Sequence, residues 1–187
     1  LITKGSENPG DFPSDNFVSN ETSLLDVASS FSDPARKGRA YVGVGPDQNF
    51  SYMALMEPAM SYIVDIRRGN LLELMVYRAC FEASPRRVEF LGCLLSRQVV
   101  EGIPFAPDTF APLAKAYAEV KGDRELAKKT TEATVALMQR LGLTLEKKDR
   151  EGISKVIDAF RDKGLSLAYT MEGSSRKYPT FGELMSM

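Results

Sequence analysis

The sequence predicts an α/β protein, with a partial parallel sheet of about three visible strands and a large helical insertion. Two short apolar runs, Ala40 to Val44 and Met60 to Asp65, are rich in strand-forming residues and are separated by one helical segment. The stretch from Ser84 to Lys163 shows helical periodicity, and a third apolar run, Leu165 to Thr170, follows it. Strands joined through helices in this order pair in parallel by right-handed crossovers.

The N-terminal region is expected to hold a leader and then one helix. Glycines, prolines and small polar residues dominate the first 15 positions, which is typical of extended chain. Ser19 or Asn20 would cap the helix, and Asp33-Pro34 would end it. The residues expected on its buried side are Leu24, Leu25, Val27, Ala28 and Phe31.

After the first strand, Gly45-Pro46-Asp47 forms a turn and a helix should run from about Pro46 to Met56. The second strand follows and ends in the acid Asp65. The next helix, Leu71 to Glu82, is apolar on nearly every face, so it should press deep against the sheet.

The remaining helices are expected in the C-terminal half. Their markers are Ser84-Pro85 before a helix through Leu95, a helix with Phe110 to Tyr117, one starting at Asp123 and ending before Gly142, one from Asp149 closed by Gly164, and a short one at Phe181 to Met185.

The composition narrows the function classes. The 187 residues are 43% hydrophobic and 26% charged with a net charge of -1, as expected for one globular domain without an electrostatic preference for nucleic acid or a membrane. Leu1 to Ser6 lacks the pattern of a signal peptide, and no apolar run approaches the ~20 residues of a bilayer span, so we expect a cytoplasmic protein. Histidine is absent, which excludes a Ser-His-Asp triad.

The two cysteines, Cys80 and Cys93, are 13 residues apart and form no CxxC motif. A zinc site would need further thiolate or histidine ligands, so no metal site is expected. We predict two buried thiols in helices of a reducing compartment.

A glycine-containing turn and a strand-end acid suggest a nucleoside site. Gly43 and Gly45 bracket the end of the first strand, where a bare backbone lets a ligand approach the next helix N-terminus. Asp65 lies 20 residues after Gly45, a spacing that suits an acid binding both ribose hydroxyls. Ordinary turn glycines beside an exposed aspartate remain the alternative.

Tyr41-Val42-Gly43-Val44-Gly45-Pro46-Asp47-Gln48-Asn49 resembles the first motif of class I S-adenosylmethionine-dependent methyltransferases, and Ile63-Val64-Asp65-Ile66 resembles their second. The resemblance implies a Rossmann-like fold, with the glycine loop along the methionine part of the cofactor and Asp65 on the ribose. The implied cofactor-binding residues are Gly43, Val44, Gly45, Asp47, Asn49, Asp65, Ile66 and Arg67. The chain also looks like a group of uncharacterised bacterial proteins.

The resemblance is incomplete. Asp47 replaces the usual third glycine, and no Asn-Pro-Pro-Tyr type motif identifies the methyl acceptor or a catalytic residue. Asn16, Asn20 and Glu21 are the candidate substrate-binding residues, because the segment before the first strand commonly folds over the ligand in such proteins. Helix capping explains Asn20 equally well.

These elements divide the chain into four segments. They are a leader with its helix (1–33), a Rossmann-like nucleotide-binding half (34–83), a helical insertion (84–163), and the third strand with the C-terminal tail (164–187). A three-stranded sheet has an unpaired edge. We therefore expect either further strands in a longer chain, or a partner, including a second copy, that completes the sheet.

Two other function classes stay open. The first is a non-catalytic interaction or structural protein that retains a Rossmann-like core. The second is an NADP-dependent oxidoreductase in which Arg67 or Arg68 would hold the 2′-phosphate.

Overall fold

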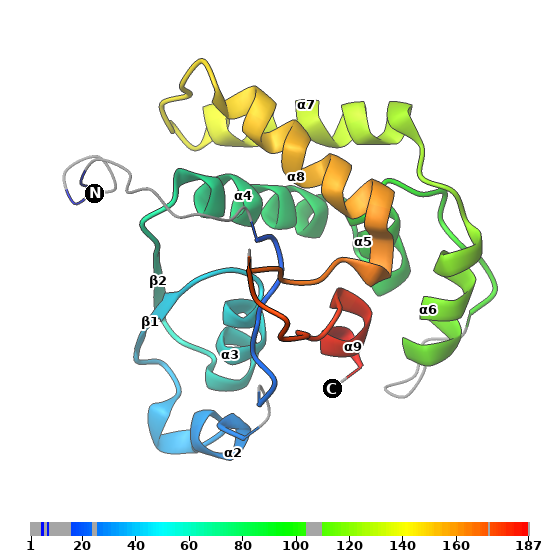
Figure 1. Cartoon of the computed structure of the whole chain (residues 1–187). Coiled ribbons are helices and arrows are strands. Elements are labelled where there is room, and N and C mark those ends of the chain that lie inside the picture. Colours follow the sequence, from blue (N-terminus) through cyan, green and yellow to red (C-terminus); the bar gives the residue numbers. More distant parts are fainter. Residues whose placement is uncertain are drawn as a thin grey trace.

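The structure is a computed structural model that describes residues 5, 7, 16–23, 26–103, 110–171 and 173–186. It is mainly helical, with a small parallel sheet at one side (Figure 1). Its elements are α2 (Ala28–Phe31), η1 (Pro34–Arg36), β1 (Ala40–Val44), α3 (Gln48–Met56), β2 (Met60–Val64), α4 (Arg68–Ala83), α5 (Arg87–Leu94), α6 (Phe110–Glu119), α7 (Arg124–Arg140), α8 (Asp149–Lys163), η2 (Gly164–Ser166) and α9 (Phe181–Met185).

The predicted strand, helix, strand unit is confirmed. β1 and β2 pair in parallel from Ala40 with Met60 to Val44 with Val64, and α3 is the connection between them. The register places the residues after each strand, Gly45 and Asp65, at the same edge of the sheet. This edge is where α/β proteins bind ligands.

Helix α4 lies at the centre of the helical part, with α7 and α8 packed over it (Figure 1). The predicted helix starts and ends in this region hold: the Asp123 carboxylate accepts hydrogen bonds from the first turn of α7, and Gly164 ends α8 at a φ of 55°. The fully buried core residues include Val76, Leu91, Leu94, Met138, Ile153 and Phe160.

The expected third strand is wrong. The chain from Gly164 to Ser166 forms the 3₁₀ helix η2, and beyond it the described residues hold only an isolated antiparallel bridge between Ala168 and Thr180. Leu167 is buried in the helical core, and its carbonyl accepts a hydrogen bond from the N–H of Phe181. The apolar residues of this segment therefore attach α9 to α8, and within the described chain the sheet has two strands.

The expected N-terminal helix is also wrong in extent. Residues 16–23 are irregular and α2 spans four residues, while Leu24 and Leu25 lie outside the described residues. Contacts with distant parts of the chain hold the segment in place: Asn16 exchanges hydrogen bonds of 3.1 and 2.8 Å with the backbone of Thr170, and Ser19 donates its N–H to Asp47. Tertiary contacts thus override the local helix signal.

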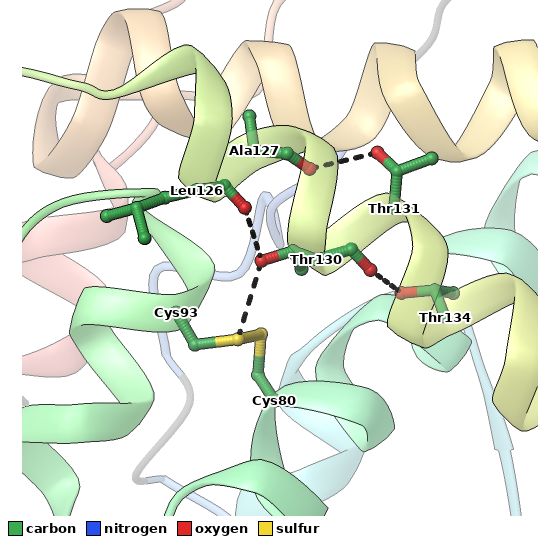
Figure 2. The surroundings of a disulfide bond; sticks show 7 residues. All are labelled: Cys80, Cys93, Leu126, Ala127, Thr130, Thr131 and Thr134. Carbon is green, nitrogen blue, oxygen red and sulfur yellow. Dashed lines mark hydrogen bonds between the residues drawn. A yellow bond between two sulfur atoms is a disulfide. The ribbon is translucent and has the colours of Figure 1, made fainter.

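The prediction of two free thiols is corrected by a disulfide between Cys80 of α4 and Cys93 of α5. Their Cα atoms are 5.6 Å apart. Figure 2 shows the bond beside α7, where the hydroxyl of Thr130 lies 3.8 Å from the Cys93 sulfur and donates to the carbonyl of Leu126. The bridge fastens two consecutive core helices.

The two faces of the sheet differ. Tyr41 and Gly43 point into the protein, whereas the alternate residues of both strands form an open apolar face. This face consists of Val42, Val44, Met60, Tyr62 and Val64. Parallel sheets are ordinarily covered on both faces, whereas the described residues leave one face of this sheet uncovered.

Among the described residues, no helix combines the length and apolar content needed to cross a bilayer.

Candidate functional site

The site begins where β1 ends and the chain turns into α3. Gly45 has a φ of 86°, a conformation that glycine adopts without strain. At Gly43, an added Cβ would lie 1.9 Å from the side-chain oxygen of Asn49 and 2.6 Å from the Tyr41 hydroxyl. Gly43 is therefore needed for the close packing of α3 on β1, as the last glycine of a dinucleotide loop is.

Asn49 fixes the shape of this turn. Its side chain is buried, its amide nitrogen donates to the carbonyls of Gly45 and Pro46 at 2.9 Å and of Val44 at 3.2 Å, and its oxygen accepts from Tyr41. Asn70 adds a 3.1 Å bond to the Gly45 carbonyl. The predicted ligand residue Asn49 is thus a positioning residue for the turn.

Asp65 stands at the neighbouring strand end, as the spacing predicts, but its carboxylate is occupied. One oxygen accepts from the N–H and the Nε of Arg67 at 2.8 and 3.2 Å. Arg67 in turn donates to the carbonyl of Asn16. Ile66, between the two charged residues, is exposed to solvent. The acid that the resemblance assigns to ribose binding is therefore paired with Arg67.

Of the candidate substrate-binding residues, the structure brings Asn16 to the site and leaves the others at the surface. Asn16 is buried between Arg67 and Thr170. Asn20 and Glu21 are exposed, and the N–H of Glu21 donates to the Ser19 hydroxyl. Arg68 points elsewhere and forms a two-pronged pair with Asp149 at 2.7 and 2.6 Å.

Asp47 is half-buried beside the turn. Its carboxylate accepts the Ser19 N–H at 2.7 Å. Burial raises the pKa of Asp47 to about 6, against the lowering effect of its backbone hydrogen bonds.

Two functional candidates were not predicted from the sequence, Glu73 and Tyr77 of α4. Both are buried, and within the described chain neither the Glu73 carboxyl oxygens nor the Tyr77 hydroxyl has a hydrogen-bond partner. Burial, and then the nearby charge of Asp47, raise the pKa of Glu73 well above 4.5 and that of Tyr77 well above 10. The signal in the sequence is an acid within the apolar run from Leu71 to Tyr77.

A pocket of about 330 Å³ opens between α3, α4, α5 and α9. Its polar lining residues are Ser19, Asp47, Gln48, Ser51, Ser84, Arg86 and Arg87, and its other lining residues are Phe50, Tyr77, Phe81, Pro85, Phe90, Phe181, Leu184 and Met185. Asp47 is the residue of the implied cofactor set that lines this pocket; Gly43, Gly45 and Asp65 lie outside it. The described residues contain no cluster of three or more acids and cysteines suited to a metal ion.

Replacing Glu73 by methionine should raise the free energy of unfolding by about 1–3 kcal/mol at pH 7, because a buried polar group without partners is replaced by an apolar one of similar size. With a raised pKa, the folded protein keeps a proton that the unfolded chain releases, so wild-type stability falls as pH rises above about 4.5. Urea unfolding across pH 4 to 8 should show a smaller fall in the variant.

The exposed Glu119 of α6 provides the matched control. Glu119→Met should change stability by less than about 0.5 kcal/mol. A Glu73→Met protein that is less stable than wild type at pH 7 would show that Glu73 has a partner in solution.

These features define a class: a mainly helical domain built onto a parallel β–α–β unit, with a glycine turn and an acid at adjacent strand ends. Residues 16–152 match the family model described as "Domain of unknown function (DUF7790)". The match spans nearly three quarters of the sequence, so the chain belongs to this family. No curated protein and no solved structure gives a significant match.

Proposed function

We propose that the chain is an S-adenosylmethionine-binding, methyltransferase-like protein whose methyl acceptor is unknown. One observation carries the proposal: the pairing of Val44 with Val64 sets the Gly45 turn beside Asp65 at the carboxyl edge of two parallel strands. This is the placement that a nucleoside cofactor requires, since the backbone bend and the ribose-binding acid must share one crevice.

The residues fit the cofactor in part. Asp65 would accept the ribose hydroxyls, and Gly45 would let the backbone approach the ligand. Arg67 is held against Asp65, so binding has to exchange the Asp65–Arg67 contacts for ligand contacts. When bound, the cofactor supplies an electrophilic methyl group, and the protein has to align the acceptor with it.

Calorimetric titration with S-adenosylmethionine, S-adenosylhomocysteine and NADPH tests the proposal. We expect saturable binding of the first two, weakened by Asp65→Asn about tenfold or more through loss of charge-assisted hydrogen bonds. Asp33→Asn is the control, because Asp33 is exposed and caps η1, a role that asparagine fills. Silence with all three nucleotides would overturn the proposal.

Binding of NADPH alone would instead support the oxidoreductase alternative. The structure gives that alternative less support, because Arg67 pairs with Asp65 and Arg68 pairs with Asp149.

The second candidate function is a non-catalytic interaction protein, and the open apolar face of the sheet favours it. The face carries Val42 and Val44 at 68% and 67% exposure and Val64 at 58%. A second copy or another partner packed against this face would cover it, and further strands would complete the sheet at its edge. If a second copy does so, light scattering should show a dimer that Val42→Lys with Val64→Lys converts to monomer; a wild-type monomer at all concentrations would contradict self-association.

The cytoplasmic location expected from the sequence stays a prediction. The Cys80–Cys93 bond argues against that prediction, because structural disulfides persist mainly in oxidising compartments.

A further inference from the structure

The pocket between α3, α4, α5 and α9 carries chemistry that the nucleoside proposal does not use. Its walls are aromatic: the rings of Phe50 and Tyr77 are 5.2 Å apart, and those of Phe81 and Phe90 stack at 4.5 Å. Nearly half of the Phe81 side chain is exposed. Such a lining suits a flat apolar body, and the volume is that of a small-ligand site.

Acceptor atoms gather where the pocket meets the start of α3. Asp47 contributes a half-buried carboxylate, and Gln48 contributes a side-chain oxygen that has no hydrogen-bond partner within the described chain. The buried Tyr77 hydroxyl also lacks a described partner, and it lies within electrostatic reach of both Asp47 and Glu73. These acceptor atoms favour a ligand group that donates hydrogen bonds and carries a positive charge.

The arginines that line the pocket do not reverse this preference. Arg86 is already paired with Glu89 and Glu101. Arg87 starts α5 at the same side and has interactions of its own. Neither of them is among the groups that set the electrostatics of Asp47 or Tyr77.

We propose that this pocket binds a small aromatic amine, with the ring among Phe50, Tyr77, Phe81 and Phe90 and the ammonium group on the Asp47 carboxylate. The ammonium then forms an ion pair with the Asp47 carboxylate. The Tyr77 hydroxyl and the Gln48 oxygen accept hydrogen bonds from its remaining N–H groups. Asp47 is the residue that the pocket shares with the implied cofactor-binding set, but Asp65 and Gly45 do not line the pocket, so the inference does not rest on them.

The test uses three probes that share the indole ring and differ in the terminal group of the side chain: tryptamine, tryptophol and indole-3-acetate. We expect tryptamine to bind saturably by calorimetry, tryptophol about 10- to 100-fold more weakly, and indole-3-acetate not at all. Equal binding of tryptamine and tryptophol, preference for the acid, or no binding by folded protein would overturn the proposal.

Two variants locate the bound probe. Asp47→Asn should weaken tryptamine about tenfold or more and leave tryptophol nearly unchanged, since the amide still accepts the Ser19 N–H. Asp65→Asn, the matched change at the nucleoside site, should leave tryptamine binding unaltered. Loss of tryptamine binding in Asp65→Asn alone would place the amine at the strand ends and contradict the inference.

Ser51 offers a blocking variant, because it is exposed on α3 and lines the pocket. Ser51→Trp should remove the binding of tryptamine and tryptophol while circular dichroism remains native. Ser30→Trp, on the exposed side of α2, is the control and should bind both probes as wild type does. Unchanged tryptamine binding in Ser51→Trp would overturn the assignment of the pocket.

Discussion

Phe160→Ala is expected to lower the free energy of unfolding by about 3–5 kcal/mol, the usual cost of removing a large buried ring. Phe160 of α8 is fully buried, and its ring makes edge contacts with Tyr77 and Phe181 at 5.9 and 5.3 Å between centroids. One side chain therefore joins α8 to α4 and α9. The cavity left by the ring would border all three helices, and because these helices are packed together they can relax only a little to fill it.

Urea unfolding followed by circular dichroism measures the effect. Phe81→Ala is the matched control, because Phe81 is 47% exposed although its ring also stacks on a neighbour. It should cost less than half as much. Equal losses in the two variants would contradict the central place of Phe160 in the core.

The second large effect is expected from the disulfide. Replacing Cys80 and Cys93 together by serine should lower the free energy of unfolding by about 3 kcal/mol, because the bond closes a loop of 13 residues and restricts the unfolded chain. The bond also lies in the core between α4 and α5, where serine hydroxyls would be poorly satisfied.

Denaturation with and without a reductant measures this contribution. The reductant should destabilise the wild-type protein and leave the double variant unchanged. Alkylation of two thiols in the unreduced, unfolded wild-type protein would contradict the bond.

Periodicity and capping predicted the helices from α3 onward well, but not the extent of the N-terminal helix. Asp123 and Gly164 mark helix ends by their own local chemistry, so α7 and α8 begin and end close to the expected residues. The prediction of a strand over 165–170 is wrong because alternating apolar residues suit a buried loop as well as a strand. Leu167 takes its place among helices, a choice that depends on tertiary contacts.

The candidate site was predictable in its backbone and not in its side chains. The 20-residue spacing placed Gly45 beside Asp65, because parallel register converts sequence distance into proximity. The pairing of Asp65 with Arg67 and the capture of the turn by Asn49 depend on rotamers that no spacing encodes. The disulfide likewise depends on how α4 meets α5, which the separation of the cysteines does not determine.

The side-chain amide of Asn16 links the N-terminal and C-terminal parts of the described chain, because it forms hydrogen bonds with the backbone of Thr170, 154 positions away in the sequence. The region shared with the family stops at residue 152, inside α8 and ahead of the buried Ile153, Val156, Ile157 and Phe160. A recombinant protein that ends at residue 152 would lose the Asn16–Thr170 hydrogen bonds and the buried residues of α8. If such a protein is insoluble, the cause is the truncation, so proteins made for experiments should retain the chain through α9.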